Sequence, residues 1–138
     1  MDEFAQDENQ PVVRVLVVDD QRQFLEVAAE LIGAAPGFEA VGSARSAEAA
    51  LEWLRHDEAD LLLMDVRMPG CDGVSAARRV AEDGTAAVIV LVSSDPWPEI
   101  AADPTGYGVH AFCRKEALRP ALLQRLWIEH RPPTRAPT

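Results

Sequence analysis

Five short apolar runs alternate with helical patterns along this chain, and this alternation limits the fold more than any other feature. Helical spacing of apolar residues follows the first, second, third and last of these runs. The first run is almost continuously apolar, as expected of a strand that is covered on both faces. Such alternation is typical of βαβ units, so we predict five parallel strands in the order 2-1-3-4-5 between helices. The runs comprise residues 12–18, 38–43, 61–64, 86–92 and 109–113.

The first two helices are predicted from their apolar stripes and from the residues at their ends. The first carries Phe24 on its apolar face. We expect it to end at Gly33 and Pro36-Gly37, because glycine and proline commonly mark the end of a helix. Ser46 precedes the second stripe and is a favoured N-cap residue, so we expect the second helix to begin directly after it.

The remaining helical patterns lie further along the chain. One spans Val74–Ala81, and the last spans Leu118–Glu129 with Pro120 in its first turn, where proline is tolerated. A further helix belongs in segment 95–108, between the fourth and fifth strands. Three prolines and two glycines crowd that segment, so we predict an irregular or shortened fourth helix there.

Length and charge restrict the kind of protein. The 138 residues suit one domain, which we place at residues 11–130, between an acidic tail (1–10) and a proline-rich tail (131–138) that is too short for an effector domain. A net charge of −10 argues against direct nucleic-acid binding. No apolar stretch approaches the roughly 18 residues of a membrane span. The acidic N-terminus is unlike a secretory signal, so we expect a cytoplasmic protein.

Reactive polar residues follow four of the five predicted strands. Asp19 and Asp20 follow the first, Asp65 the third, Ser93 the fourth and Lys115 the fifth. In a parallel sheet of this order the carboxyl ends of the strands meet at one edge, where ligands bind. We therefore expect these five side chains to converge.

The chemistry of that edge points to a metal and a phosphoryl group. Two carboxylates about 4 Å apart repel by about 4 kcal/mol at an effective dielectric near 20, and Mg²⁺ with oxygen ligands offsets such repulsion. Lys115 is the only lysine among 13 basic residues. Lysine is a compact, mobile charge that suits a phosphate oxygen, and the Ser93 hydroxyl can donate to another. We predict that Asp65 accepts a phosphoryl group as an acyl phosphate.

Four motifs contain the predicted site residues: VLVVDDQ (15–21), LLLMDVRMPGCDG (61–73), VLVSSD (90–95) and AFCRK (111–115). In this order they resemble the receiver domain of two-component response regulators. The resemblance spans roughly residues 12–130 and implies the flavodoxin-like (βα)5 fold, a three-layer sandwich. It also implies a histidine kinase or phosphotransfer protein as the donor, an unknown downstream protein target, and the capacity to form a homodimer.

The resemblance further assigns roles to single residues. It implies Mg²⁺ bound by Asp20, Asp65 and the backbone carbonyl of Arg67, with Asp19 contributing chiefly through water. It makes Ser93 the switch hydroxyl and Phe112 the switch aromatic.

Arg67 and Asp95 each lie two residues beyond a residue of the predicted site. We hypothesise that their side chains pair over the site and obstruct the hydrolytic water.

Three functions agree with the sequence. The first is a phosphorylation-dependent switch, which is a phosphoacceptor with slow autodephosphorylation rather than an enzyme. The second is an interaction module that keeps the fold but ignores phosphorylation. The third is a phosphohydrolase with an aspartyl nucleophile, which the adjacent acids Asp19-Asp20 disfavour because such enzymes usually carry an Asp-x-Asp pattern.

Overall fold

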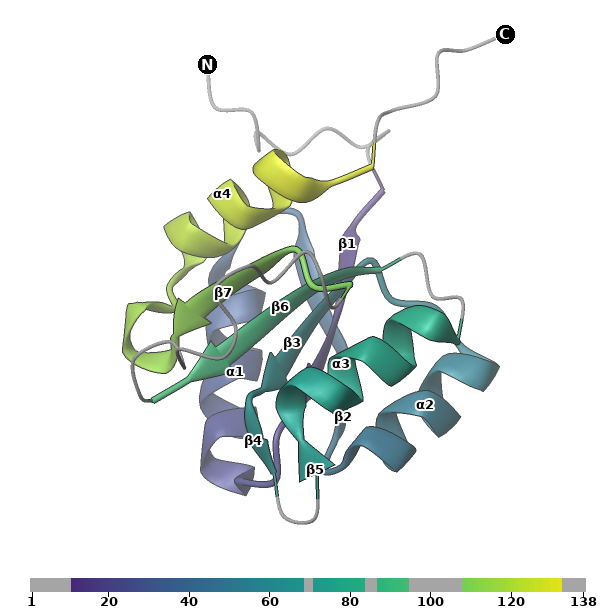
Figure 1. Cartoon of the computed structure of the whole chain (residues 1–138). Helices are drawn as coiled ribbons and strands as arrows, with labels where there is room; N and C mark the ends of the chain where they lie inside the picture. The colour runs from purple at the N-terminus through teal and green to yellow at the C-terminus, as the bar shows by residue number, and fades with distance from the viewer. Residues whose placement is uncertain (1–10, 69–70, 84–86, 95–107, 133–138) are drawn as a thin grey trace, which may run out of the picture.

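A parallel sheet forms the centre of the protein. The computed structural model describes residues 11–68, 71–83, 87–94 and 108–132. Five parallel strands form a sheet in the order β2-β1-β3-β6-β7 (Figure 1). This order confirms the predicted 2-1-3-4-5 arrangement. The strands are β1 (Val13–Val18), β2 (Phe38–Ala44), β3 (Leu61–Asp65), β6 (Val88–Ser93) and β7 (Ala111–Arg114).

Helices cover both faces of the sheet and make the three predicted layers. In Figure 1, α1 and α4 lie on one face of the sheet, and α2 and α3 lie on the other. As predicted, Ser46 caps α2, since its hydroxyl accepts a hydrogen bond from the Ala49 amide at 3.0 Å. The helices are α1 (Arg22–Ala34), α2 (Ala47–His56), α3 (Gly73–Glu82) and α4 (Pro120–His130), with a 3-10 turn, η3 (Lys115–Ala117), after β7.

Alternation along each strand divides the apolar side chains between two cores. Successive side chains of a strand point to opposite faces. Val15 and Val17 therefore belong to the core under α1 and α4, and Leu16 and Val18 to the core under α2 and α3. We call these the α1/α4 core and the α2/α3 core. The main helical residues are Ala28, Ile32, Leu123 and Leu126 in the first, and Ala47, Ala50, Leu51, Ala76, Ala77 and Val80 in the second.

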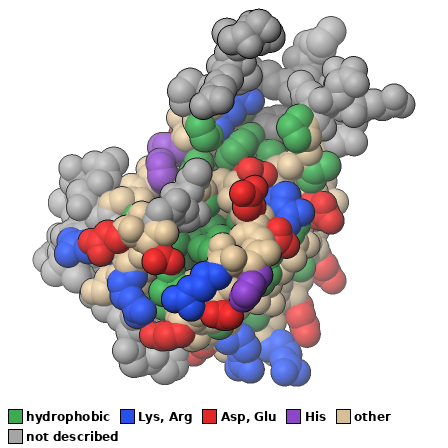
Figure 2. Space-filling model, turned by 90° about the vertical axis from the view of Figure 1, so that its right-hand side faces the viewer, with side chains coloured by type: hydrophobic (Ala, Val, Ile, Leu, Met, Phe, Trp, Pro, Cys, Tyr) green, Lys and Arg blue, Asp and Glu red, His purple; other side chains and the backbone are tan. Residues whose placement is uncertain are grey.

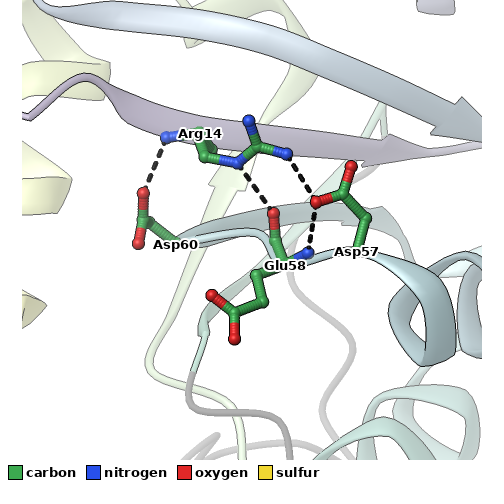
Figure 3. Close-up of polar contacts among 4 residues, drawn as sticks. All are labelled: Arg14, Asp57, Glu58 and Asp60. Carbon is green, nitrogen blue, oxygen red and sulfur yellow. Dashed lines mark hydrogen bonds and ion pairs between the residues drawn. The ribbon is translucent and has the colours of Figure 1, made fainter.

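Polar contacts at the amino end of the sheet fix β1 against β3 (Figure 3). The Arg14 amide donates to the Asp60 carboxylate at 2.8 Å, and the Asp60 amide donates to the Arg14 carbonyl at 2.8 Å. The Arg14 guanidinium reaches Asp57 at 2.8 Å and the Glu58 carbonyl at 2.9 Å. Exposed ion pairs contribute little stability, so the satisfied backbone groups matter more here. They keep the two strands in register.

The end of α1 differs from the prediction. Gly33 lies inside the helix, which continues to Ala34. A Cβ built at Gly33 would meet no atom within 4 Å, so this exposed glycine costs the helix some propensity but no contact. The chain turns after Ala35, where Gly37 adopts a φ of 84° that favours glycine.

The start of β7 also differs, because a histidine side chain takes part in the strand pairing. The His110 amide donates to the Ile89 carbonyl at 2.8 Å, but the Ile89 amide donates to Nδ1 of His110 at 3.0 Å. Regular pairing therefore begins at Ala111 rather than at Val109 as predicted. The last helix likewise begins at Pro120 rather than at Leu118.

Two predicted features fall on segments outside the described residues. The sequence Met68-Pro69-Gly70 predicts a turn, and its last two residues are one such segment. On either side, Arg67–Met68 (β4) and Cys71–Asp72 (β5) pair as a short antiparallel hairpin that we did not predict. The irregular fourth helix within 95–108 is the other, except for Gly108.

The described surface is mixed in charge. Figure 2 shows acidic and basic side chains interspersed over one side of the molecule. Among the described residues, Val12 and Val27 are the exposed large hydrophobic residues, so that part of the chain carries no extended apolar patch. No helix in the described ranges has the length and hydropathy needed to cross a membrane.

Candidate functional site

Strand register brings the predicted site residues to one edge of the sheet. Val18 of β1 pairs with Met64 of β3, so the residues that follow, Asp19 and Asp65, lie beside each other. Asp65 pairs with Val92, which places Ser93 one residue further along β6. As expected from the sequence, the register brings Asp19, Asp65 and Ser93 to the same edge of the sheet.

The three aspartates form a compact acidic cluster. Asp19, Asp20 and Asp65 each place a carboxylate oxygen within 4.8 Å of the others. Asp19 is fully buried and Asp65 is 6% exposed. Oδ1 of Asp19 accepts a hydrogen bond from the Gln21 amide at 2.8 Å, which ties the carboxylate to the start of α1. Oδ2 of Asp19 is buried and accepts no hydrogen bond among the described residues.

Lys115 points into this cluster. Its Nζ lies 2.6 Å from Oδ2 of Asp19 and 3.8 Å from Oδ1 of Asp65. The Lys115 side chain is only 12% exposed. The contact with Asp19 is thus a short, largely buried ion pair. The only lysine of the chain therefore provides a positive charge against two buried carboxylates.

The environment of Asp65 disfavours its ionised form. Burial raises the pKa of the Asp65 carboxyl above its ordinary value, and the neighbouring charge of Asp19 raises it further. The Lys115 ammonium and a hydrogen bond from the Arg67 backbone act in the opposite direction, but do not cancel the increase in pKa. A second cation at the cluster, in addition to Lys115, would favour the ionised form of Asp65.

The cluster fits a hard divalent cation. Its donor atoms are all carboxylate oxygens, and among the described residues Oδ2 of Asp19 has an ion pair with Lys115 but no hydrogen bond. Mg²⁺ prefers oxygen ligands and is usually held by one or two carboxylates plus water. Asp20 is only partly buried, so the cluster is open to solvent on that side. Asp19, Asp20 and Asp65 could hold such an ion together.

Ser93 and Phe112 occupy the other face of the sheet. Ile89 and Leu91 of β6 belong to the α2/α3 core, so alternation directs Ser93 toward the same side. Ser93 is 3% exposed, and Phe112 is half-buried against the α2/α3 core. Asp65 follows Leu61 and Leu63, which belong to the α1/α4 core. Ser93 and Phe112, the predicted switch pair, thus lie on the α2/α3 side of the sheet. Asp65, the predicted phosphoacceptor, lies on the α1/α4 side.

Two residues contact the site without having been predicted to do so. Arg45 donates to the Asp20 carbonyl from Nη2 at 2.9 Å and from Nε at 3.3 Å, and so holds the loop after β1. The distance from the centroid of the Phe24 ring to Nζ of Lys115 is 4.4 Å. Phe24 was predicted as part of the apolar face of the helix, and its spacing gives no sign of this contact. The side chain of Asp95, the predicted partner of Arg67, lies outside the described residues.

Comparison with known proteins identifies the family to which the chain belongs. Residues 15–127 match the family model of the response regulator receiver domain. The signal receiver domain of the response regulator NarL from Mycobacterium tuberculosis has a similar structure, with a TM-score of 0.74 and 30% identity. The alignment covers 85% of this chain and 98% of that one.

Two curated relatives show the same similarity, one of them in a much longer protein. The chain is 40% identical over 89 residues to the two-component response regulator ORR41 of Oryza sativa subsp. japonica, covering 63% of this chain and 70% of the relative. It is 36% identical over 84 residues to a protein-glutamate methylesterase/protein-glutamine glutaminase of Nocardioides sp. (strain ATCC BAA-499 / JS614). That match covers 61% of this chain but 23% of the relative, so the chain spans about a quarter of that protein.

Proposed function

Because the chain belongs to the response regulator receiver domain family, we propose that it is a phosphoacceptor switch whose acceptor is Asp65. The observation that carries the proposal is the cluster of Asp19, Asp20 and Asp65 with the Lys115 ammonium directed into it. Buried carboxylates at this spacing are costly, and a role in metal and phosphoryl binding explains why they are gathered there.

The proposed reaction transfers one phosphoryl group. An Asp65 carboxylate oxygen forms the new bond to phosphorus as the bond between phosphorus and the nitrogen of a phosphohistidine breaks, leaving an acyl phosphate on Asp65. Lys115 pairs with one phosphate oxygen, and the Ser93 hydroxyl donates to another. Asp20, Asp65 and the Arg67 carbonyl would hold Mg²⁺, with Asp19 contributing chiefly through water. Such an ion would supply positive charge against the negative charge that develops on transfer.

The proposed output is a change at the opposite face of the sheet. Ser93 moves toward the phosphate, and Phe112, half-buried beside the α2/α3 core, turns into the space that this movement opens. Phosphorylation then shifts a two-state equilibrium and with it a protein-binding surface.

The proposal also covers the binding partners of the protein and its cellular compartment. The donor is a sensor histidine kinase or phosphotransfer protein, and the target is a protein rather than nucleic acid or membrane, with homodimerisation as one form of output. The compartment is the cytoplasm. The methylesterase activity of the longer relative is not carried over, because the match covers 23% of that protein. The chain by itself is proposed to be a phosphoacceptor rather than an enzyme.

Incubation with acetyl phosphate and Mg²⁺ tests the acceptor directly. We expect intact mass spectrometry to show one added phosphoryl group that alkali removes, and Asp65→Asn to abolish it. Because the amide keeps the shape of the side chain, Asp65→Asn removes the nucleophile and one metal ligand without changing the packing. The Glu30→Gln variant, an acid-to-amide change on the exposed side of α1, should be modified like the wild type. If Asp65→Asn still takes up the group, the acceptor lies elsewhere; if the wild type takes up none, the phosphorylation-independent module becomes the better reading.

Arg67→Ala tests the proposed control of phosphate lifetime. If Arg67 and Asp95 obstruct the hydrolytic water, removing the guanidinium should speed autodephosphorylation about fivefold, the equivalent of about 1 kcal/mol in the barrier. The loss of phosphate from purified phosphoprotein over time gives the rate. Arg55→Ala is the matched control, since Arg55 is exposed near the end of α2, toward the opposite edge of the sheet. An unchanged rate in Arg67→Ala would rule out the obstruction.

A further inference from the structure

Three contacts surround the Lys115 ammonium, and one of them is aromatic. Nζ lies near carboxylate oxygens of Asp19 and Asp65, and the ring of Phe24 has its centroid 4.4 Å away. We propose that Phe24 is a positioning residue, whose ring holds the Lys115 ammonium at the acidic cluster, ready for a phosphate oxygen. This inference rests on the proposed function, because it concerns the group that would meet the phosphate.

The attraction has a physical basis at this distance. The face of an aromatic ring carries a negative potential, and a cation within about 6 Å of the centroid is attracted to it, most strongly when water is excluded. The Lys115 side chain is 12% exposed, so little water competes. A leucine in place of Phe24 would fill similar space without this attraction.

Phe24 is itself held in place from two sides. It lies in the first turns of α1 and is half-buried against the α1/α4 core. The same end of α1 is tied to the acidic loop, since the Gln21 amide donates to Oδ1 of Asp19 at 2.8 Å and the Leu25 amide donates to the Gln21 carbonyl at 3.2 Å. The ring and the carboxylate that flank the ammonium are therefore both anchored at the start of α1.

A fixed ring matters because lysine is flexible. Its ammonium sits on a four-carbon stem and has many conformations when unconstrained. Between Phe24 and Asp19, Lys115 is restricted to the side of the site where Asp65 lies. Preorganised charge of this kind lowers the cost of binding an anion, because less ordering is left to occur on binding.

Simple packing is the competing explanation for Phe24. If the ring only fills space between α1 and the end of β7, its replacement should affect stability whatever the charge at position 115. If it acts on the ammonium, its effect should vanish once the ammonium is gone. A double-mutant cycle separates these cases.

The experiment measures beryllofluoride binding in the presence of Mg²⁺ for the wild type, Phe24→Leu, Phe24→Tyr, Lys115→Met and the double variant Phe24→Leu/Lys115→Met. We expect Phe24→Leu to weaken binding about fivefold. Phe24→Tyr, which keeps the aromatic face, should stay within about twofold of the wild type. In the Lys115→Met background, Phe24→Leu should cause no further loss.

Unfolding of the metal-free proteins provides a readout that is independent of the ligand. The effects of Phe24→Leu and Lys115→Met on the free energy of unfolding should be non-additive if ring and ammonium interact. Phe38→Leu is the matched control, since Phe38 is an aromatic residue of the same α1/α4 core at the start of β2. It should lower stability without weakening beryllofluoride binding.

The outcomes distinguish this inference from the proposed function. Wild-type affinity in Phe24→Leu, or independent effects of Phe24→Leu and Lys115→Met, would overturn the positioning role alone. A wild-type chain that binds no beryllofluoride would overturn the proposed function and the positioning role together.

Discussion

Replacing Asp65 by asparagine should make the metal-free protein more stable at neutral pH, by about 1 kcal/mol. Burial and the charge of Asp19 raise the pKa of Asp65, so its ionised form is unfavourable in the folded state. An amide of the same shape carries no charge and escapes this cost. Functional sites commonly reduce stability in this way.

The sign of the pH dependence follows from the direction of the pKa change. A raised pKa means that the folded protein binds the Asp65 proton more tightly than the unfolded chain does. The wild type therefore loses stability relative to Asp65→Asn as pH rises from about 3.9, the ordinary value for aspartate, through the raised pKa. At lower pH, where both states are protonated, the two proteins should be equally stable.

Magnesium should reverse the order of stability. A ligand that binds only the folded state adds about 2.7 kcal/mol at a concentration of 100 times its dissociation constant. The wild type should gain this and Asp65→Asn should gain much less. Urea unfolding at several pH values, with EDTA or with Mg²⁺, measures both effects. Glu30→Gln, the exposed control, should respond to Mg²⁺ like the wild type; an Asp65→Asn variant less stable than the wild type in EDTA would contradict the electrostatic argument.

Gly108→Ala should cost the protein about 3 kcal/mol of stability, for two additive reasons. Gly108 has a φ of 79°, in the left-handed region that a Cβ disfavours by about 1–2 kcal/mol. A Cβ at this position would also lie 2.6 Å from the Cβ of Ala81 on α3, and such overpacking typically costs 1–3 kcal/mol. Gly108 leads directly into buried Val109 and β7, so the chain has little room to move away.

Gly33→Ala is the matched control for this prediction. Gly33 lies inside α1, and a Cβ there would meet no atom within 4 Å. Alanine should therefore stabilise the protein by about 0.5–1 kcal/mol through better helix propensity. Thermal or urea unfolding of the two variants and the wild type gives both changes in the free energy of unfolding. A Gly108→Ala protein as stable as the wild type would show that the approach of α3 to this turn is looser than described.

The sequence was sufficient to predict the sheet, because its strands are marked by continuous apolar runs. A run such as Leu61–Met64 is buried on both faces, so its order and direction follow from the alternation with helices. The convergence of Asp19 and Asp65 then follows, because adjacent parallel strands end at the same edge.

Features that depend on one local contact could not be predicted in the same way. The strand β7 begins late because Nδ1 of His110 accepts the Ile89 amide, and a hydrogen bond of this kind leaves no pattern in the sequence. The β4–β5 hairpin has two residues in each strand, too few to show a period of two. Gly33 looked like a helix end, yet a single exposed glycine costs a helix only about 1 kcal/mol.

The contacts at the site also divide into those that the sequence predicted and those that depend on one local side-chain contact. Lys115 was predicted to reach the acids because it is the only lysine and follows the last strand. Its packing against Phe24 depends on the side-chain conformations of two residues separated by most of the chain. Arg45 reaches the Asp20 carbonyl from a neighbouring loop, and nothing in its sequence context distinguishes it from other arginines.

The opposite orientations of Asp65 and of Ser93 with Phe112 have a practical consequence for anyone who wishes to rewire such a protein. Under the proposed function, substitutions beneath α1 and α4 would act on the side of Asp65, and substitutions beneath α2 and α3 on the side of Ser93 and Phe112. Away from the edge where Ser93 would meet the phosphate, substitutions in the two cores should have largely additive effects on stability, because the sheet lies between them.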